Sequence, residues 1–230
     1  MDTFPFIPNG KVKVSYDWQS KEKTFEDKST QYVRKRIHAA KTYSFHIGGT
    51  DFARLVNFYN SHRGQLDSFY FVYDNNTEEC YFSSALNPKI HRENGKAVAY
   101  DCEVSLTVIK QTRKYAAPKE TDMLPSLRNE VTHSYDWGTD LINFGVATQR
   151  RMTREKPKTV LSGEWTGSKA NRDKVISIFN SHCRTPASIK YGGKVLKVIL
   201  PDKLEITDLR EQTVIVGFEC SVDLEVIGGE

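Results

Sequence analysis

The sequence lacks the features of a membrane or secreted protein. No apolar run approaches the ~20 residues that a membrane-spanning helix needs. Residues 1–13 also lack the basic and then apolar order of a signal peptide. We therefore expect a protein that is made and assembled in a cytoplasm and does not enter a membrane.

Metal and cofactor signatures are missing as well. The chain has four cysteines, which are Cys80, Cys102, Cys183 and Cys220. None of them forms a C-x-x-C pair, and cytosolic thiols are normally reduced. A glycine-rich phosphate loop and a His-Glu-x-x-His helix are absent too. The sequence therefore predicts no metal, no cofactor and no catalytic residue, and it favours a protein that is not an enzyme.

Charge of one sign is also scarce. The 33 basic and 29 acidic residues leave a net charge of +4, which is too balanced to indicate nucleic-acid binding. The basic groups at Arg34 and at Arg150 and Arg151 are the best candidates for such binding. Few aromatic residues accompany them, so no stacking platform for bases is evident.

The sequence is rich in internal repetition. Ser15-Tyr16-Asp17-Trp18 returns 119 residues later as Ser134-Tyr135-Asp136-Trp137. Asn60-Ser61-His62 returns after 120 residues, and the apolar alternation that begins at Cys102 returns after 118 residues at Cys220. Three blocks in the same order at nearly the same spacing indicate a tandem duplication. We predict a first module over residues 1–112, a proline-containing linker over 113–130 and a second module over 131–230.

Each half has the same predicted order of elements. Apolar residues alternate with polar ones over 12–16, 41–47 and 99–109, as in half-buried strands, and 69–73 is an aromatic strand. A helical apolar spacing covers 51–63, with a counterpart over 169–183. This order predicts an α+β fold that is mainly β, with one helix packed against antiparallel sheet in each module. Cys102 and Cys220 should be buried and unpaired.

The two Asn-Ser-His segments and the two Asp-Trp pairs invite a catalytic interpretation. Neighbouring residues on a helix point apart, so Ser61 should not bond His62 directly. A histidine that contacts the last helical carbonyls is the simpler interpretation. Asp17 and Asp136 are expected to accept backbone hydrogen bonds at strand ends.

Two polar segments, 19–36 and 138–156, follow the first strand of each half. They are predicted either as long exposed loops or as β-hairpin arms, and either as solvated or as docked on an adjacent subunit. Long polar excursions at the same place in both halves need something to order them, which favours contacts between subunits.

The arms carry a family resemblance. The second half runs Tyr135-Asp136-Trp137, Phe144-Gly145 and Gln149-Arg150-Arg151, followed by strand, helix and strands. In the first half Phe25-Glu26-Asp27, Gln31 and Arg34 occupy the same arm. This order resembles the minor tail-tip proteins of lambda-like siphophages and the related distal tail proteins, whose arm has a Phe-Gly-Asp-Gly…Gln-Arg segment.

The resemblance implies two tandem tail-tube-like β-sandwich modules, each with one flanking helix, in a structural virion protein. Such a protein forms a ring that joins the tail tube to the distal hub and lets DNA pass as cargo. Its partners are then itself, the tail tube protein and the hub or baseplate proteins. Two modules per chain favour a homotrimer with pseudo-six-fold symmetry, with a homohexamer second. The alternative is a carbohydrate- or receptor-binding β-domain of a virion.

Overall fold

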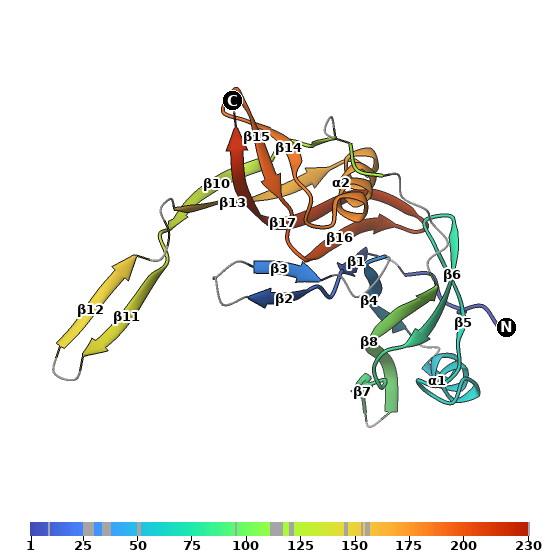
Figure 1. Ribbon diagram of the computed structural model, residues 1–230. Helices are drawn as coiled ribbons and strands as arrows, with labels where there is room; N and C mark the ends of the chain where they lie inside the picture. The colour runs from blue at the N-terminus through green and yellow to red at the C-terminus, as the bar shows by residue number, and fades with distance from the viewer. Residues whose placement is uncertain are drawn as a thin grey trace.

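The computed structural model describes residues 1–8, 10–24, 30–33, 38–49, 52–94, 96–110, 117–119, 122–144, 147–152, 154 and 157–229. Over these residues the protein is mainly β, with two helices and one large mixed open sheet of 13 strands (Figure 1). Two further pairs of strands form separate two-stranded sheets. The predicted mainly-β class, with one helix in each half, is confirmed.

The first half contains the elements β1 (Gly10–Asp17), β2 (Lys21–Thr24), β3 (Thr30–Val33), β4 (Ala40–Gly49), α1 (Phe52–Ser61), β5 (Phe69–Tyr73), β6 (Asn76–Phe82), β7 (Lys89–Glu93) and β8 (Lys96–Lys110). Alternation decides the strands, because Val12, Val14 and Tyr16 of β1 are buried while the residues between them are not. Asp74 and Asn75 both have positive φ, the geometry of a tight turn between β5 and β6.

The second half contains β9 (Met123–Leu124), β10 (Arg128–Asp136), β11 (Thr139–Phe144), β12 (Ala147–Met152), β13 (Lys158–Gly167), α2 (Lys169–His182), β14 (Ala187–Tyr191), β15 (Lys194–Ile199), β16 (Lys203–Glu211) and β17 (Val214–Gly229). Strand β9 and the start of β10 lie inside the predicted linker. Helix α2 begins after Ser168 as expected, although the serine side chain makes no capping hydrogen bond.

The strand pairing of the second half repeats that of the first. Strand β8 pairs with β4, β6 and β7, and β17 pairs with β13, β15 and β16 in the same way. Strand β1 pairs with β4, and β10 pairs with β13. Trp18 follows β1 and Trp137 follows β10, so the two tryptophans occupy the same place in the repeat.

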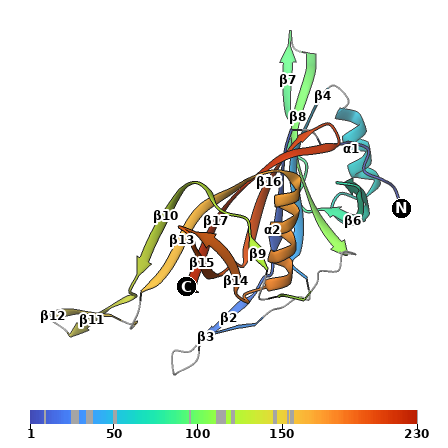
Figure 2. The same cartoon turned by 90° about the horizontal axis from the view of Figure 1, so that it is seen from above.

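One antiparallel pairing joins the two halves. Strand β1 runs beside β16 over eight residue pairs, from Gly10 opposite Arg210 to Asp17 opposite Lys203. The large sheet is therefore continuous through both halves. Helix α2 lies against β13, β17 and β9 (Figure 2). The first residues of the chain pack on their own first half, where the Phe4 ring is buried among those of Phe69 and Phe71.

Candidate assembly surfaces

In the first half the side chains of the repeated serine and histidine contact each other. Ser61 Oγ lies 3.1 Å from His62 Nδ1, so the prediction that neighbouring helix residues cannot make this contact is wrong. The last residues of the helix curl around one carbonyl, because Ser61 Oγ and His62 Nδ1 each lie 2.9 Å from the Phe58 oxygen. A Nδ1–H that donates to this carbonyl cannot also take the serine proton. The pair therefore has the geometry of a helix end and not of a nucleophile with its base.

In the second half the same residues have other partners. Ser181 Oγ donates to the Ile178 carbonyl at 3.1 Å. His182 Nδ1 lies 2.9 Å from the Pro186 carbonyl, and its Nε2 lies 3.1 Å from Asp122 Oδ2. This histidine thus joins α2 to the segment before β9. The two copies share a place in the fold but not a hydrogen-bond network, which argues against a duplicated catalytic site.

The repeated aspartates end strands, as expected. Asp17 Oδ1 accepts a hydrogen bond from the Gln19 amide at 2.7 Å, and Asp136 Oδ1 accepts one from the Gly138 amide at 2.8 Å. The Gly138 amide and the Arg154 guanidinium hold the pKa of Asp136 below its ordinary value. Both aspartates therefore fix the turn that leads into an arm.

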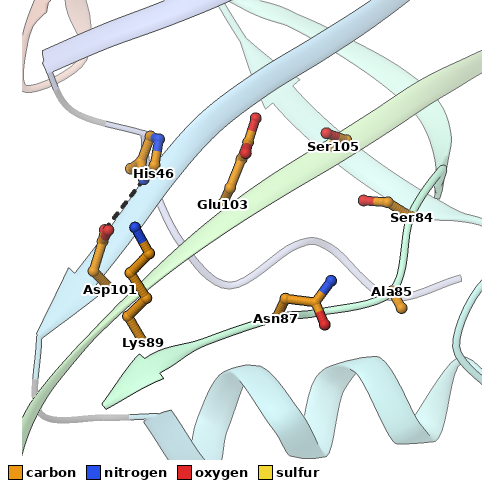
Figure 3. A pocket seen from close by; sticks show the side chains of 8 residues that line it. All are labelled: His46, Ser84, Ala85, Asn87, Lys89, Asp101, Glu103 and Ser105. Atoms are coloured by element: carbon orange, nitrogen blue, oxygen red, sulfur yellow. Dashed lines mark hydrogen bonds and ion pairs between the residues drawn. The ribbon is translucent and has the colours of Figure 1, made fainter. Parts of the chain in front are cut away.

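A polar cavity of about 460 Å³ lies beside the start of β7 (Figure 3). His46 of β4 contacts Asp101 of β8 at one side of it at 3.2 Å, with Lys89 beside them, and Glu103 and Asn87 also line the cavity. None of the lining residues carries a phenyl, phenol or indole ring on which a sugar could stack. Over the part of the chain that the structure describes, no cluster of side chains could hold a metal ion. None of the described helices is long and apolar enough to span a membrane.

The predicted inter-subunit residues that the structure describes fall on two hairpins. Strands β2 and β3 form one hairpin and β11 and β12 the other, so the hairpin interpretation of the polar segments is confirmed over the described residues. The β11–β12 hairpin projects away from the large sheet (Figure 1). Gln31 lies on β3, Phe144 on β11, and Gln149, Arg150 and Arg151 on β12. Phe25, Glu26, Asp27, Arg34 and Gly145 lie outside the described residues.

The two halves are joined by a seam, which we define as the pairing of β1 with β16 together with the side chains packed on it. Tyr16 and Trp18 are each 2% exposed. Their rings both lie 6.4 Å from that of Phe179 on α2. The Trp18 amide also donates to the Asp202 carbonyl at 3.2 Å. The first half therefore uses its repeated Tyr-Asp-Trp segment to bind the helix of the second half.

A buried polar cluster reinforces this seam. Arg172 of α2 makes two hydrogen bonds to Asp208 of β16, and Tyr73 of β5 donates to the same carboxylate. Burial alone would lower the pKa of Arg172. The hydrogen bonds and the charge of Asp208 raise this pKa by more than burial lowers it, so the net shift is upward. Lys169 Nζ reaches Asp74 of the β5–β6 turn at 2.8 Å. Removing Asp208 or Arg172 alone would leave a buried charge without its partner, which destabilises a protein strongly.

The second copy of the Tyr-Asp-Trp segment has no such cover. Tyr135 is 62% exposed and Trp137 is 44% exposed, although both repeat residues that are buried in the first half. Strand β10, which leads into them, pairs with β13, and no second neighbour of β10 lies among the described residues. Comparison of the two halves in sequence identified these residues as equivalent. It could not show that only the first pair is buried, because the covering helix lies outside the repeated segment.

The face of the sheet opposite the core is lined with polar side chains from both halves. Lys13 of β1 pairs with Glu205 of β16 at 2.5 Å, and Lys158 of β13 pairs with Glu225 of β17 at 2.8 Å. Exposed pairs of this kind contribute little to stability. Together with Ser15 and Asp17 they form a hydrophilic surface that crosses the seam.

No known protein-family model matches the chain, and no curated protein sequence matches it.

Proposed function

We propose that the protein is a structural component of a phage tail tip or baseplate, in which it forms a ring between the tail tube and the distal hub. The observation that carries this proposal is the seam. One chain already holds two copies of the same arrangement edge to edge, with their hydrophilic faces continuous across the junction. Repeating that head-to-tail junction from chain to chain gives a closed ring when the rotation at each junction closes.

In this proposal each half is one tail-tube-like module with one flanking helix. The polar face, whose cations and carboxylates are largely paired, lines a channel through which DNA passes without being held. The β2–β3 and β11–β12 hairpins contact adjacent subunits or the stacked tail tube and hub proteins. Two modules per chain favour a homotrimer with pseudo-six-fold symmetry, and a homohexamer is the second arrangement. The protein acts by assembly in the virion and catalyses no reaction.

Native mass spectrometry and negative-stain imaging of the purified chain test the proposal. A particle with the mass of three chains and a central hole is the expected result, and six chains would change the stoichiometry but leave the ring. A monomer at all concentrations, with binding to a glycan array, would overturn the ring and favour the carbohydrate- or receptor-binding alternative. The polar cavity beside β7 is where such a ligand would be sought.

A further inference from the structure

We infer that the internal seam is repeated between chains, so that strand β10 of one copy lies against strand β7 of a second copy. This inference rests on the proposed ring for the premise that copies associate, and it deepens that proposal by naming the two surfaces that meet. The partner is a second copy because one chain carries both halves of the contact. Figures 1 and 2 place β10 and β7 on different sides of the molecule, as a head-to-tail contact requires.

The two strands are the repeat equivalents of the seam strands. Strand β10 repeats β1, because Ser15 and Ser134 are 119 residues apart. Strand β7 repeats β16 in detail. Each has a register shift at the same point, between His91 and Arg92 in β7 and between Leu209 and Arg210 in β16. Each is followed by a residue with positive φ, Asn94 at 49° and Gln212 at 54°.

In β10 and β7, the edges that correspond to the paired edges of β1 and β16 have no partner strand among the described residues. Within the described residues, β10 pairs with β13 alone, and β7 pairs with β8 alone. Each therefore has one edge without a partner strand in the described part of the chain, and such an edge is a template for another strand. The internal seam demonstrates that edges of this pair are complementary, since β1 and β16 match over eight residue pairs.

Both open edges also carry exposed side chains at positions whose repeat equivalents are buried in the internal seam. Tyr135 and Trp137 stand where the buried Tyr16 and Trp18 stand in the first half. The surface that would receive them on a second copy includes three apolar residues, of which Tyr59 and Leu86 are partly buried against their own core. Tyr59 repeats Phe179, Leu86 repeats Leu204, and Ile90, which is 44% exposed, repeats the buried Asp208. Covering these rings and side chains would supply the hydrophobic contribution that the open edges lack.

The repeat also fixes the register. In the internal seam Val12 lies opposite Asp208, and Lys13 lies opposite Thr207. The equivalent pairs between chains are Val131 with Ile90, and Thr132 with Lys89. Val131 and Ile90 would then face the core side, as their equivalents do. This register places an apolar pair where the internal seam has a valine against a carboxylate.

The seam between chains is expected to be weaker than the internal one. Pro88, which stands where Ile206 stands in β16, has no N–H to donate, so it ends the backbone pairing at Lys89. Strand β10 also has an irregular register between Arg128 and Thr132. The buried ion pair of the internal seam has no counterpart either, because Phe52 stands at the place of Arg172 and Ile90 at that of Asp208. Such an edge limits uncontrolled strand addition before assembly.

Disulfide trapping tests the register. The Trp18–Asp202 hydrogen bond shows that the even residues of β1 make the backbone bonds to β16, so Lys13 and Thr207 form a non-hydrogen-bonded pair. Cα atoms in such pairs are about 4.5 Å apart, which a disulfide can bridge. The variant carries Thr132→Cys and Lys89→Cys, with Cys183→Ser to remove a partly exposed thiol. Oxidation should yield covalent oligomers up to the closed ring, and mixing the two single variants should yield covalent dimers.

A matched control moves one cysteine out of register. In Thr132→Cys with Glu93→Cys, the second cysteine lies four residues from the expected position at Lys89, so this variant should not cross-link. A second variant, Tyr135→Ser with Trp137→Ser, should lose the oligomer, while its melting temperature stays close to that of the wild type when both are compared as monomers. If the wild-type ring forms but the first variant does not cross-link and the second still assembles, the seam is wrong and the ring stands. If the wild type never assembles, or Thr132→Cys cross-links only to another tail protein, the contact between copies is overturned.

Discussion

Replacing the equivalent tryptophans of the two halves should have different consequences: Trp18→Ala should lower stability, and Trp137→Ala should prevent assembly. Trp18→Ala removes an indole that is 2% exposed and packs on Phe179 across the internal seam. Truncating a buried tryptophan to alanine costs about 3–5 kcal/mol. In a chain of this size each kcal/mol shifts the melting temperature by about 2–4 °C, so Trp18→Ala should melt roughly 10 °C lower. Trp137→Ala removes a side chain that is 44% exposed, and the monomer should lose less than about 1 kcal/mol.

The assay is urea unfolding of both variants, together with the mass of each in solution. Trp18→Ala should unfold at lower urea, and Trp137→Ala should unfold near the wild type but fail to assemble. Melting must be compared in the monomeric state, because assembly adds stability by mass action. Equal destabilisation by the two substitutions would refute the assigned difference in burial. An unchanged assembly of Trp137→Ala would refute its role between chains.

Three further results are expected. Thiol reagents should reach Cys102 and Cys220 only after unfolding, because both are buried and unpaired and burial raises the pKa of Cys220 to about 12; rapid labelling of the native protein would contradict this. Deleting residues 21–33 should abolish assembly and leave a folded monomer by circular dichroism, whereas an intact ring would show that this arm is dispensable. The bond from Lys13 lowers the pKa of Glu205, so its stabilisation is present above the ordinary value of 4.5 and is lost as pH falls through the lowered pKa. Glu205→Gln should therefore cost at most about 1 kcal/mol at neutral pH and match the wild type in acid, and a constant difference would exclude this cause.

The periodicity of apolar residues predicted both helices and the buried cysteines correctly. The helices at 52–61 and 169–182 lie within the predicted ranges, since their apolar spacing repeats in both halves. Cys102 and Cys220 are buried and unpaired, as their place on alternating strands predicts. Strand β7 was missed because all five of its residues are exposed, so its sequence shows no alternation between buried and solvated positions.

The seam between the halves could not be predicted, because it is made by contacts between residues that are far apart in the sequence. The pairing of Val14 with Ile206 joins residues almost 200 positions apart, and nothing near either residue indicates the other. The contact of Ser61 with His62 was excluded on ideal helix geometry, but it forms at the end of the helix, where both side chains turn to the Phe58 carbonyl. The repeated Tyr-Asp-Trp segments have the same sequence, so only the surrounding elements could show which copy is covered.

The internal seam also changes how a ring could be reached in time. Two separate modules would have to find one another by diffusion at every junction. Here the β1–β16 junction is made within one molecule, where a tether gives the partners an effective concentration on the order of millimolar. Every second junction of a ring is thus complete when the chain folds, and dilute subunits need only half as many encounters to close it.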